Sequence, residues 1–304
     1  MGFRLILGAM LSVAIAAPAW AEPLAVTEIA PGIFVHQGAV AEPGPDNRGD
    51  TANIGFIVGG SGVAVIDTGG TPELGHRLRE TIAARTDKPP VVVINTHMHP
   101  DHVFGNAAFG EVPVVGHANL RDALAARIEV YRRRLAEELG AEAAAGIAPV
   151  RVDRPVGEEV RIDLGDRVIV LTAHPTAHTN NDLTVFDRQT GTLFAGDLLF
   201  LDHLPAVDGS AVGWLRVLDA LERVPAMRAV PGHAPSVADW PGALDPQRRY
   251  LTTLVEGVRR VLKAGGSIQD AVAHVAEDER ARWLLFDVYN PRNVTATFAE
   301  LEWE

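Results

Sequence analysis

The sequence predicts an α/β protein built as a four-layer αββα sandwich, in which two sheets pack face to face and helices cover both outer surfaces. Strand-like and helical segments alternate in two similar rounds. The first round ends near His97 and the second near His233, and in each round polar residues follow apolar, strand-like runs at turns. Two such halves would each bury one sheet face against the other half.

The first round runs from residue 24 to about residue 145. The strands expected there are 32–36, 53–58, 63–66, 91–95 and 112–115, and the helices are 73–85 and 119–145. The loop 41–48, which contains Pro43 and Pro45, separates two of these strands. We expect this loop to overhang the functional site.

The second round begins at about residue 160. Its expected strands are 160–162, 167–172, 182–186, 192–195 and 228–230, and its helices are 210–224 and 245–264, with further short helices over 267–301 around Asn290-Pro291. No low-complexity linker divides the chain. We therefore expect residues 22–304 to form a single domain with a C-terminal helical segment over about residues 245–304.

Residues 1–21 have the pattern of a secretory signal peptide. An apolar run from Leu5 to Ala17 is followed by the small-x-small sequence Ala19-Trp20-Ala21. The run is shorter than a membrane span requires. We expect cleavage after Ala21, no stable membrane insertion after that cleavage, and a periplasmic protein.

Composition narrows the classes of function. The chain has no cysteine, so its stability depends on its core without disulfides and no thiolate can bind metal. Its formal net charge of −12 disfavours nucleic acid as a partner, because phosphate backbones would be repelled. The one basic cluster, Arg132-Arg133-Arg134, lies among glutamates on an expected helix and is interpreted as a solvated, salt-bridged face.

The segment from His97 to His102 contains three imidazoles and a carboxylate directly after an apolar run. Residues i and i+2 of a strand share a face, so His97 and His99 can direct two ring nitrogens at one point. Pro100 then turns the chain, and Asp101 and His102 can reach a second point nearby. This spacing suggests a dinuclear metal centre.

Further candidate ligands follow apolar stretches later in the chain: His178, Asp197 in a Gly-Asp pair, and His233 in Pro-Gly-His. Zinc readily accepts imidazole nitrogen and carboxylate oxygen, and three histidines with an open position are typical of catalytic sites.

These motifs, together with Asp67 in Val65-Ile66-Asp67-Thr68-Gly69, resemble the five-motif signature of the metallo-β-lactamase superfamily over roughly residues 25–235. The resemblance implies the same αββα fold. It also implies that His97, His99 and His178 hold one ion, that Asp101, His102 and His233 hold the other, and that Asp197 bridges them. In that family the equivalent of Asp67 is a buried acid that braces the ligand loop.

The missing cysteine argues against the principal true β-lactamase subclasses, which depend on one, and favours the all-His/Asp hydrolases. More locally, Asp50-Thr51-Ala52-Asn53, Gly105-Asn106 and Asp208-Gly209-Ser210 resemble exported SoxH-like hydrolases of sulfur-oxidation and quinoprotein systems. This narrower resemblance suggests a functional link to such a periplasmic system and leaves the substrate open.

The sequence therefore predicts an exported hydrolase that acts on a small molecule. Two zinc ions per chain, with iron or manganese as alternatives, would generate a bridging hydroxide that attacks an ester, thioester, lactone or amide carbonyl. Asp101 would orient this hydroxide and relay its proton.

Two other functions stay open at this point. Related enzymes hold one iron in a similar ligand set and oxidise persulfides, and iron also favours open His/carboxylate sites. The full set of seven ligands favours the hydrolase over such an oxygenase. The other alternative is a non-catalytic exported accessory protein that binds a cofactor or partner.

Several polar residues outside the ligand set have two interpretations each. His203 is either a substrate contact or an exposed loop histidine, and His174 either supports the centre or is a loop polar group. For His117 a hydrogen bond at a strand end is favoured over catalysis. Asp208 and Trp214 either shape the pocket or, as we prefer, cap and anchor the helix that starts near them. His36, His76 and His274 are expected to be structural or solvated.

Overall fold

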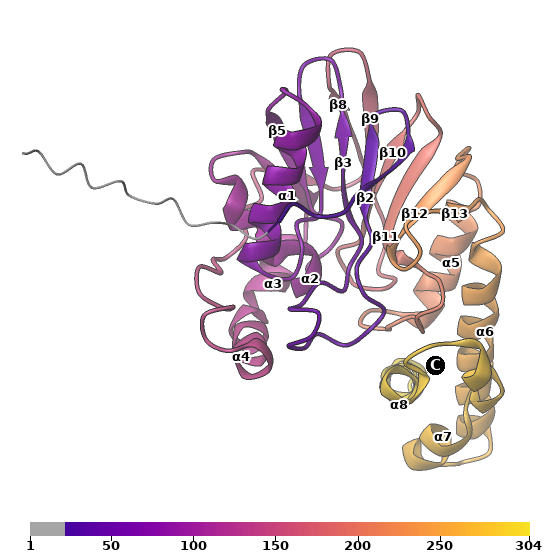
Figure 1. Ribbon diagram of the computed structural model, residues 1–304. Helices are drawn as coiled ribbons and strands as arrows, with labels where there is room; N and C mark the ends of the chain where they lie inside the picture. Colours follow the sequence, from indigo (N-terminus) through magenta and orange to yellow (C-terminus); the bar gives the residue numbers. More distant parts are fainter. Residues whose placement is uncertain (1–21) are drawn as a thin grey trace, which may run out of the picture.

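Two mixed sheets form the centre of the computed structural model, which describes residues 22–304 (Figure 1). The expected signal peptide lies outside the described residues. The first sheet has seven strands in sequential order: β1 (Thr27–Ala30), β2 (Ile33–His36), β3 (Ile54–Val58), β4 (Val63–Ile66), β5 (Pro90–Ile94), β6 (Val114–His117) and β7 (Arg154–Val156). Strands β1 to β4 pair antiparallel, whereas β4 to β7 pair parallel.

The second sheet has six strands in the order β13-β12-β11-β10-β9-β8. They are β8 (Glu159–Asp163), β9 (Val168–Ala173), β10 (Leu183–Asp187), β11 (Thr192–Phe200), β12 (Arg228–His233) and β13 (Ala238–Asp239). All neighbours pair antiparallel except β11 and β12, which run parallel. The first sheet thus has three parallel pairs and the second has one, and the carboxyl ends of such strands can carry functional residues.

The side-chain alternation of the strands explains why the sheets pack together. In β4, Val63 and Val65 belong to the core beneath the helices of the first half, whereas Ala64 and Ile66 belong to the core between the sheets. The second sheet contributes its own residues, such as Leu171, to this central core. Because strands such as β4 are buried on both faces, they are continuously apolar.

The helices of the first half cover the outer face of the first sheet (Figure 1). They are α1 (Pro72–Arg85), the short α2 (Pro100–Val103), the 3₁₀ helix η1 (Phe104–Phe109), α3 (Leu120–Ala125) and α4 (Ile128–Leu139). Helix α1 begins at an N-cap, Thr71, whose side chain accepts from the Leu74 N–H, with Pro72 in its first turn.

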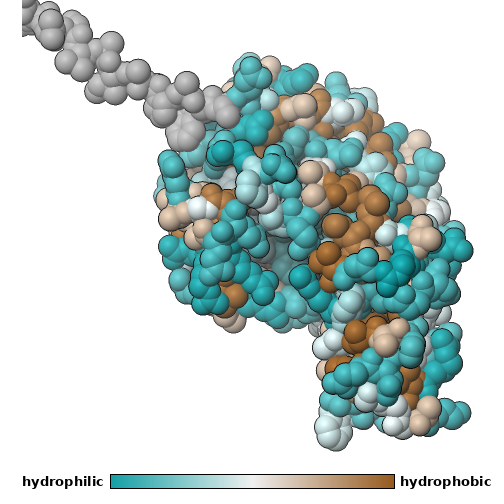
Figure 2. All heavy atoms as spheres, turned by 60° about the horizontal axis from the view of Figure 1, so that its bottom comes forward, coloured by the Kyte–Doolittle hydropathy of each residue, from teal (hydrophilic) through white to brown (hydrophobic). Residues whose placement is uncertain are grey.

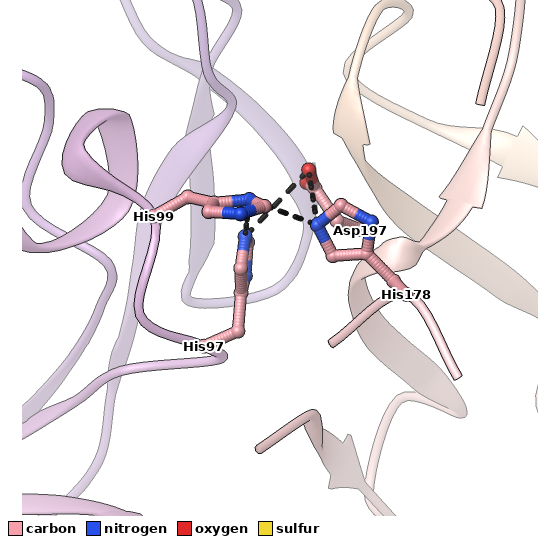
Figure 3. A group of neighbouring side chains, drawn as sticks. All are labelled: His97, His99, His178 and Asp197. Carbon is pink, nitrogen blue, oxygen red and sulfur yellow. Dashed lines mark hydrogen bonds and ion pairs between the residues drawn. The ribbon is translucent and has the colours of Figure 1, made fainter. Parts of the chain in front are cut away.

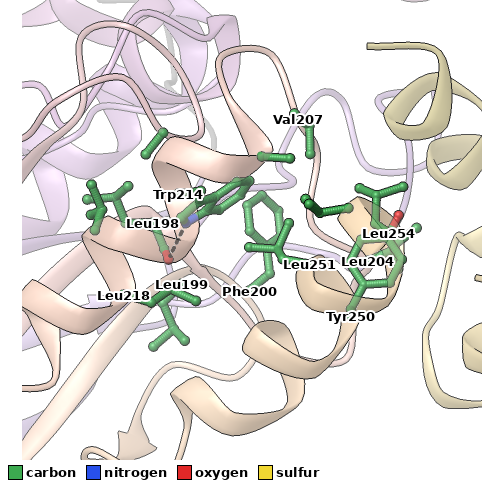
Figure 4. Packing of buried hydrophobic residues seen from close by; sticks show 14 of the residues in the cluster. Leu198, Leu199, Phe200, Leu204, Val207, Trp214, Leu218, Tyr250, Leu251 and Leu254 are labelled. Atoms are coloured by element: carbon green, nitrogen blue, oxygen red, sulfur yellow. Dashed lines mark hydrogen bonds between the residues drawn. The ribbon is translucent and has the colours of Figure 1, made fainter. Parts of the chain in front are cut away.

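The helices of the second half cover the outer face of the second sheet. They are α5 (Ala211–Leu221), α6 (Leu244–Lys263), α7 (Ile268–His274), the 3₁₀ helix η2 (Glu277–Arg282) and α8 (Phe286–Leu301). Figure 4 shows Phe200 of β11 among Trp214 of α5 and Tyr250 and Leu251 of α6. The four-layer αββα prediction is therefore confirmed.

Two helix predictions are wrong in their extent. The single helix expected over 119–145 is interrupted between α3 and α4, where Arg127 leaves the helical region at φ −124°, and it ends before Gly140, which adopts a φ of +91°. This positive φ is costly for residues other than glycine, so the helix stops there.

In contrast, short helices were expected around Pro291, and the chain forms one 16-residue helix, α8, with Pro291 inside it. Proline removes one backbone hydrogen bond from a helix. Buried apolar contacts of Val294 and Leu301 compensate, as do the buried amides of Asn290 and Asn293, which bond to the Tyr250 hydroxyl. Across residues 22–304, no helix is long and apolar enough to cross a bilayer.

Candidate metal centre

The predicted ligands meet at one edge of the sandwich, beyond the carboxyl ends of the parallel strands. The segment from His97 to His102 follows β5, and His178 lies in the loop between β9 and β10. Asp197 lies within β11, and His233 is the last residue of β12. Binding sites of open α/β sheets form in the same place.

One group consists of His97, His99, His178 and Asp197, whose ligand atoms lie within 4.8 Å of one another. Figure 3 shows the three rings pointing toward each other. Nδ1 of His99 lies 3.1 Å from Nε2 of His97 and 3.0 Å from Nε2 of His178. Oδ2 of Asp197 lies 3.7 Å from the first of these Nε2 atoms and 3.4 Å from the second.

A second group consists of Asp101, His102 and His233. Oδ2 of Asp101 lies 3.7 Å from Nε2 of His102 and 3.5 Å from Nε2 of His233. Asp197 contacts this group as well, because its Oδ1 is 3.2 Å from Nε2 of His102 and its Oδ2 is 3.4 Å from Nε2 of His233. The Asp197 carboxylate therefore joins the two groups.

Each of the five histidines uses its outer ring nitrogen in a hydrogen bond that points away from the centre. The acceptors are Thr96 Oγ1 for His97, Asp208 for His99, Asp67 for His102, the Ala206 carbonyl for His178 and the Thr51 carbonyl for His233, at 2.6–3.1 Å. The Thr96 hydroxyl itself donates to Asp67, so its oxygen is free to accept from His97. In each ring, when it is neutral, the outer nitrogen thus carries the proton, which leaves a lone pair on the inner nitrogen.

Asp67 lies after β4, where the sequence places the bracing acid. It is buried, and its φ of +55° is rare for a residue other than glycine. Its carboxylate accepts from Nδ1 of His102 at 2.8 Å and from both the N–H and the hydroxyl of Thr96 at 2.8 and 2.7 Å. These bonds hold both ends of the ligand segment and set the tautomer of His102.

Burial and neighbouring charges keep most of the centre in metal-binding protonation states. Burial lowers the pKa of His178 to about 4, so its ring is neutral at physiological pH. Burial by itself would raise the pKa of Asp197. The charges of His233, His102 and His97 outweigh that effect and hold this pKa well below its usual range.

His102 and His233 differ from His178. Although burial disfavours the charged form of His102, Asp197, Asp101 and Asp67 raise its pKa well above the usual value, and Asp197 and Asp101 also raise the pKa of His233. A metal ion that takes Nε2 of His102 must therefore displace a proton, as is general for histidine ligands.

The donor set fits metal ions. Inner nitrogens that carry lone pairs would repel one another at 3.0–3.1 Å unless a cation lies between them. Nε2 of His102 and Oδ1 of Asp197 are buried 3.2 Å apart without a well-aligned hydrogen bond. Buried polar groups need such partners, and a cation would satisfy both.

Gly232 keeps this space open next to Asp197. A Cβ built on Gly232 would lie 1.8 Å from Oδ1 of Asp197. Any side chain here would push the carboxylate out of its position between the two groups. The motif Pro-Gly-His therefore requires glycine at position 232, because the backbone there lies against the Asp197 carboxylate.

A cavity of about 410 Å³ opens onto the centre. Its floor includes His99, Asp101 and His233, and its walls come from the loop 41–49, α4 and α8. The expectation that the loop 41–48 overhangs the site is confirmed, because Ala41, Glu42 and Pro43 line the cavity.

His203 lines the same cavity and is not an exposed loop histidine. Its side chain is buried, and its Nδ1 donates to the Leu204 carbonyl at 2.6 Å. Its ring centroid lies 5.2 Å from that of His233 and 4.8 Å from that of Tyr289. Of its two interpretations, only the contact with a substrate stays open.

The preferred interpretation of Asp208 is wrong. Ser210, and not Asp208, caps α5, since its side chain accepts from the Gly213 N–H. The Asp208 carboxylate instead accepts from Nε2 of His99 and from Arg127, and these partners hold its pKa at about 2 against the effect of burial. Trp214 anchors α5 as expected: it is buried and donates to the Leu198 carbonyl at 3.1 Å (Figure 4).

The remaining histidines lie outside both groups. His117 accepts from the Asn119 N–H at the end of β6, as predicted, and His174 bonds to Thr184 at 2.9 Å. His36 bonds to Asp50 and to the Ala25 carbonyl, which is a structural role.

The interpretation of the basic cluster holds for two of its three members. Arg132 pairs with Glu129 and Arg133 with Glu137. Arg134 lines the cavity, and sequence reasoning missed it together with Arg127, Tyr131, Tyr289 and Arg292. No local motif marks these positions, since only the packing of α4 and α8 brings them to the centre.

Comparison with known proteins places the chain in a family. The family model described as the metallo-beta-lactamase superfamily matches residues 47–233, which is more than half of the chain. A comparison with curated proteins found no match.

Solved structures share the fold at low sequence identity. A metallo-beta-lactamase from Pontibacter korlensis superposes with a TM-score of 0.61 at 21% identity and covers 75% of this chain and 99% of its own. A metallo-beta-lactamase family protein from Thermus thermophilus gives 0.66 at 20% identity, over 91% and 94%.

The stereoselective inverting sec-alkylsulfatase Pisa1 from Pseudomonas sp. gives a TM-score of 0.71 at 18% identity. The match covers 91% of this chain and 50% of the sulfatase, so the chain spans about half the length of that enzyme. With the family match over the ligand motifs and the shared sandwich, the chain belongs to the metallo-beta-lactamase superfamily.

Proposed function

We propose that the protein is a dinuclear metal-dependent hydrolase that cleaves an ester, thioester, lactone or amide bond of a small molecule. The observation that carries the proposal is the pairing of two ligand groups through Asp197. Each group has its outer nitrogens engaged and its inner nitrogens directed at one point. Family membership supports the same class of function, as does the structural likeness to a metallo-beta-lactamase and a sec-alkylsulfatase.

Under this proposal His97, His99 and His178 hold one ion, Asp101, His102 and His233 hold the other, and Asp197 contacts both. We propose zinc, which accepts nitrogen and carboxylate ligands and has no preferred geometry to conflict with either group. Two such cations, when bound, would supply a water of lowered pKa at neutral pH and a Lewis acid for a carbonyl oxygen.

Asp101 is the residue proposed to orient the attacking water and to accept its proton. Oδ2 of Asp101 faces the second group at the cavity floor and accepts from the Thr51 hydroxyl at 3.4 Å. The charges of His102 and His233 outweigh burial and lower the pKa of Asp101, so the carboxylate is ionised and able to accept a proton. Because only two of the seven ligands are carboxylates, the centre would be net positive with two divalent cations bound, which would favour an anionic transition state.

The rival oxygenase function requires only one iron, held by one ligand group. The convergence of Asp101, His102 and His233 favours the dinuclear hydrolase, because a mononuclear site has no use for this second group.

We further propose that the protein is exported to the periplasm and acts there on a small molecule, within the narrower SoxH-like group and its sulfur-oxidation or quinoprotein systems. The apolar run before Ala21 supports export, and the acidic chain argues against a nucleic-acid partner.

Replacing Asp101 by alanine tests the catalytic assignment. We expect turnover of 4-nitrophenyl acetate and of a small thioester by the zinc-loaded protein to fall by about 10²–10⁴-fold, because the group that accepts the proton is gone. The circular dichroism spectrum should not change. Asp122→Ala, at an exposed position of α3, is the matched control and should retain activity. Turnover near that of the wild type in Asp101→Ala would refute the role of Asp101.

A further inference from the structure

We propose that Arg134 of α4 and Arg292 of α8 form a subsite for an anionic oxygen group on the substrate, at a distance from the bond that is cleaved. The proposal rests on the proposed hydrolase function and adds a substrate class to it: esters or thioesters that carry a distal carboxylate or similar oxyanion. Both arginines line the cavity that opens onto the metal centre.

The cavity wall that carries these arginines lies outside the ligand motifs. Helix α4 lies between the two rounds of motifs, and α8 lies beyond residue 233, where the family match ends. The face that carries these helices is hollowed near its centre (Figure 2). Substrate contacts made there can therefore be specific to this chain.

Three arginines line the cavity, and one of them already has a structural partner. Arg127 bonds to Asp208, which in turn accepts from Nε2 of His99. Arg127 also lies 3.4 Å from the Tyr131 hydroxyl. Arg127 therefore positions a ligand ring, and it is not available to a substrate without loss of these bonds.

Arg134 and Arg292 have no such partner. Within the described residues, neither guanidinium makes an ion pair or hydrogen bond with a carboxylate. Arg133, next to Arg134 on α4 but outside the cavity lining, is paired with Glu137. Guanidinium groups bind carboxylates in a two-pronged geometry and need an acceptor to use it.

Arg292 is held in place by aromatic packing. Its guanidinium carbon lies 5.4 Å from the centroid of the Tyr289 ring. The Tyr289 hydroxyl donates to Glu42 of the overhanging loop, and the ring packs at 4.8 Å against that of His203. This arrangement limits the motion of the guanidinium without occupying its donors.

Two acidic residues of the outer wall, Glu42 and Glu138, affect the charge of the subsite in different ways. Glu42 is occupied by the Tyr289 hydroxyl. Burial and the nearby charge of Glu42 raise the pKa of Glu138, the other glutamate in the lining, against the opposing charge of Arg134. An anion at Arg134 would be repelled by Glu138, so the removal of this carboxylate should strengthen anion binding.

The cavity wall is partly apolar, since its lining also includes the buried side chains of Leu135 and Val207. These side chains suit a short methylene spacer between the anionic group and the cleaved bond. A straight-chain dicarboxylate monoester has this arrangement of groups.

The test compares a neutral and an anionic ester on the zinc-loaded protein, namely 4-nitrophenyl butyrate and 4-nitrophenyl hydrogen glutarate. We expect Arg134→Gln and Arg292→Gln each to raise KM for the glutarate ester about tenfold and to leave the butyrate ester unchanged, because each removes one charge-assisted hydrogen bond. Glu138→Gln should lower KM for the glutarate ester. Arg133→Gln is the control: it makes the same change of charge on α4 and should leave KM for both esters unchanged.

A binding measurement separates this proposal from the hydrolase proposal. Calorimetric titration with glutaric acid mono-4-nitroanilide, an amide analogue of the anionic ester, should show tighter binding than butyric 4-nitroanilide, and the advantage should disappear in the double arginine variant. If neither ester is hydrolysed but this advantage is observed, the hydrolase function is wrong and the subsite stands. If both esters are hydrolysed and the arginine substitutions change KM for the two esters equally or not at all, the subsite is wrong and the hydrolase function stands.

Discussion

In an Asp197→Asn variant, we expect the metal content to fall from about two ions per chain to one or fewer and ester turnover to be lost. Among residues 22–304, only Asp197 has a carboxylate that contacts both ligand groups, with Oδ2 near His97, His178 and His233 and Oδ1 near His102. Asparagine keeps the size but loses the charge. Loss of an outer hydrogen-bond partner of a metal ligand costs about 10- to 100-fold in affinity, and loss of the joining carboxylate should cost more.

Elemental analysis of the purified variant, alongside the wild type loaded with the same zinc concentration, provides the measurement. Asp239→Asn, at an exposed position of β13, is the control and should retain wild-type metal content. If Asp197→Asn keeps two ions and normal turnover, the joining role of Asp197 is wrong.

The second large effect is expected from Gly232→Ala. The added Cβ would fall 1.8 Å from Oδ1 and 2.9 Å from the backbone nitrogen of Asp197, far inside contact distance, so the buried carboxylate would have to leave its position. We expect a well-folded protein that binds less metal and has at most about 1% of wild-type turnover, comparable with the loss of a catalytic proton acceptor.

Gly242→Ala is the matched control, because a Cβ at Gly242 would meet no atom within 4 Å. Circular dichroism, metal content and ester turnover should be measured on both variants. If Gly232→Ala were as active as Gly242→Ala, Asp197 could not occupy the position that the centre requires.

The fold could be predicted because its elements have strong local signals. The apolar runs of β3, β4 and β5 are continuous, and Thr71-Pro72 marks the start of α1. The short β7 and β13 were missed, since three- and two-residue strands have no periodicity of their own. The extent of α8 could not be read from Pro291, because tertiary contacts of Asn290 and Asn293 decide it.

The convergence of the ligands was predictable for a different reason. His97, His99, Asp101 and His102 are close in sequence, so strand and turn geometry alone brings them together. The hydrogen-bond partners that fix the histidine rings were harder to predict from the sequence. Asp208 becomes a partner of His99 across 109 positions of sequence, and no pattern around Asp208 distinguishes that role from helix capping.

The cavity wall was the least predictable part. Arg134 belongs to a run of arginines that looks like an ordinary solvated helix face, and Arg292 follows a proline in a segment with weak helical signals. Their position depends on how α4 and α8, which are far apart in the sequence, pack around the cavity. The sequence therefore predicts the chemistry better than the substrate.

The measurement that tests the central claim most directly is elemental analysis of the protein, purified without added metal and assayed with and without oxygen. The dinuclear hydrolase predicts about two zinc ions per chain and ester or thioester cleavage that does not depend on oxygen. About one iron per chain, with oxygen consumed on a persulfide substrate, would contradict it in favour of an oxygenase.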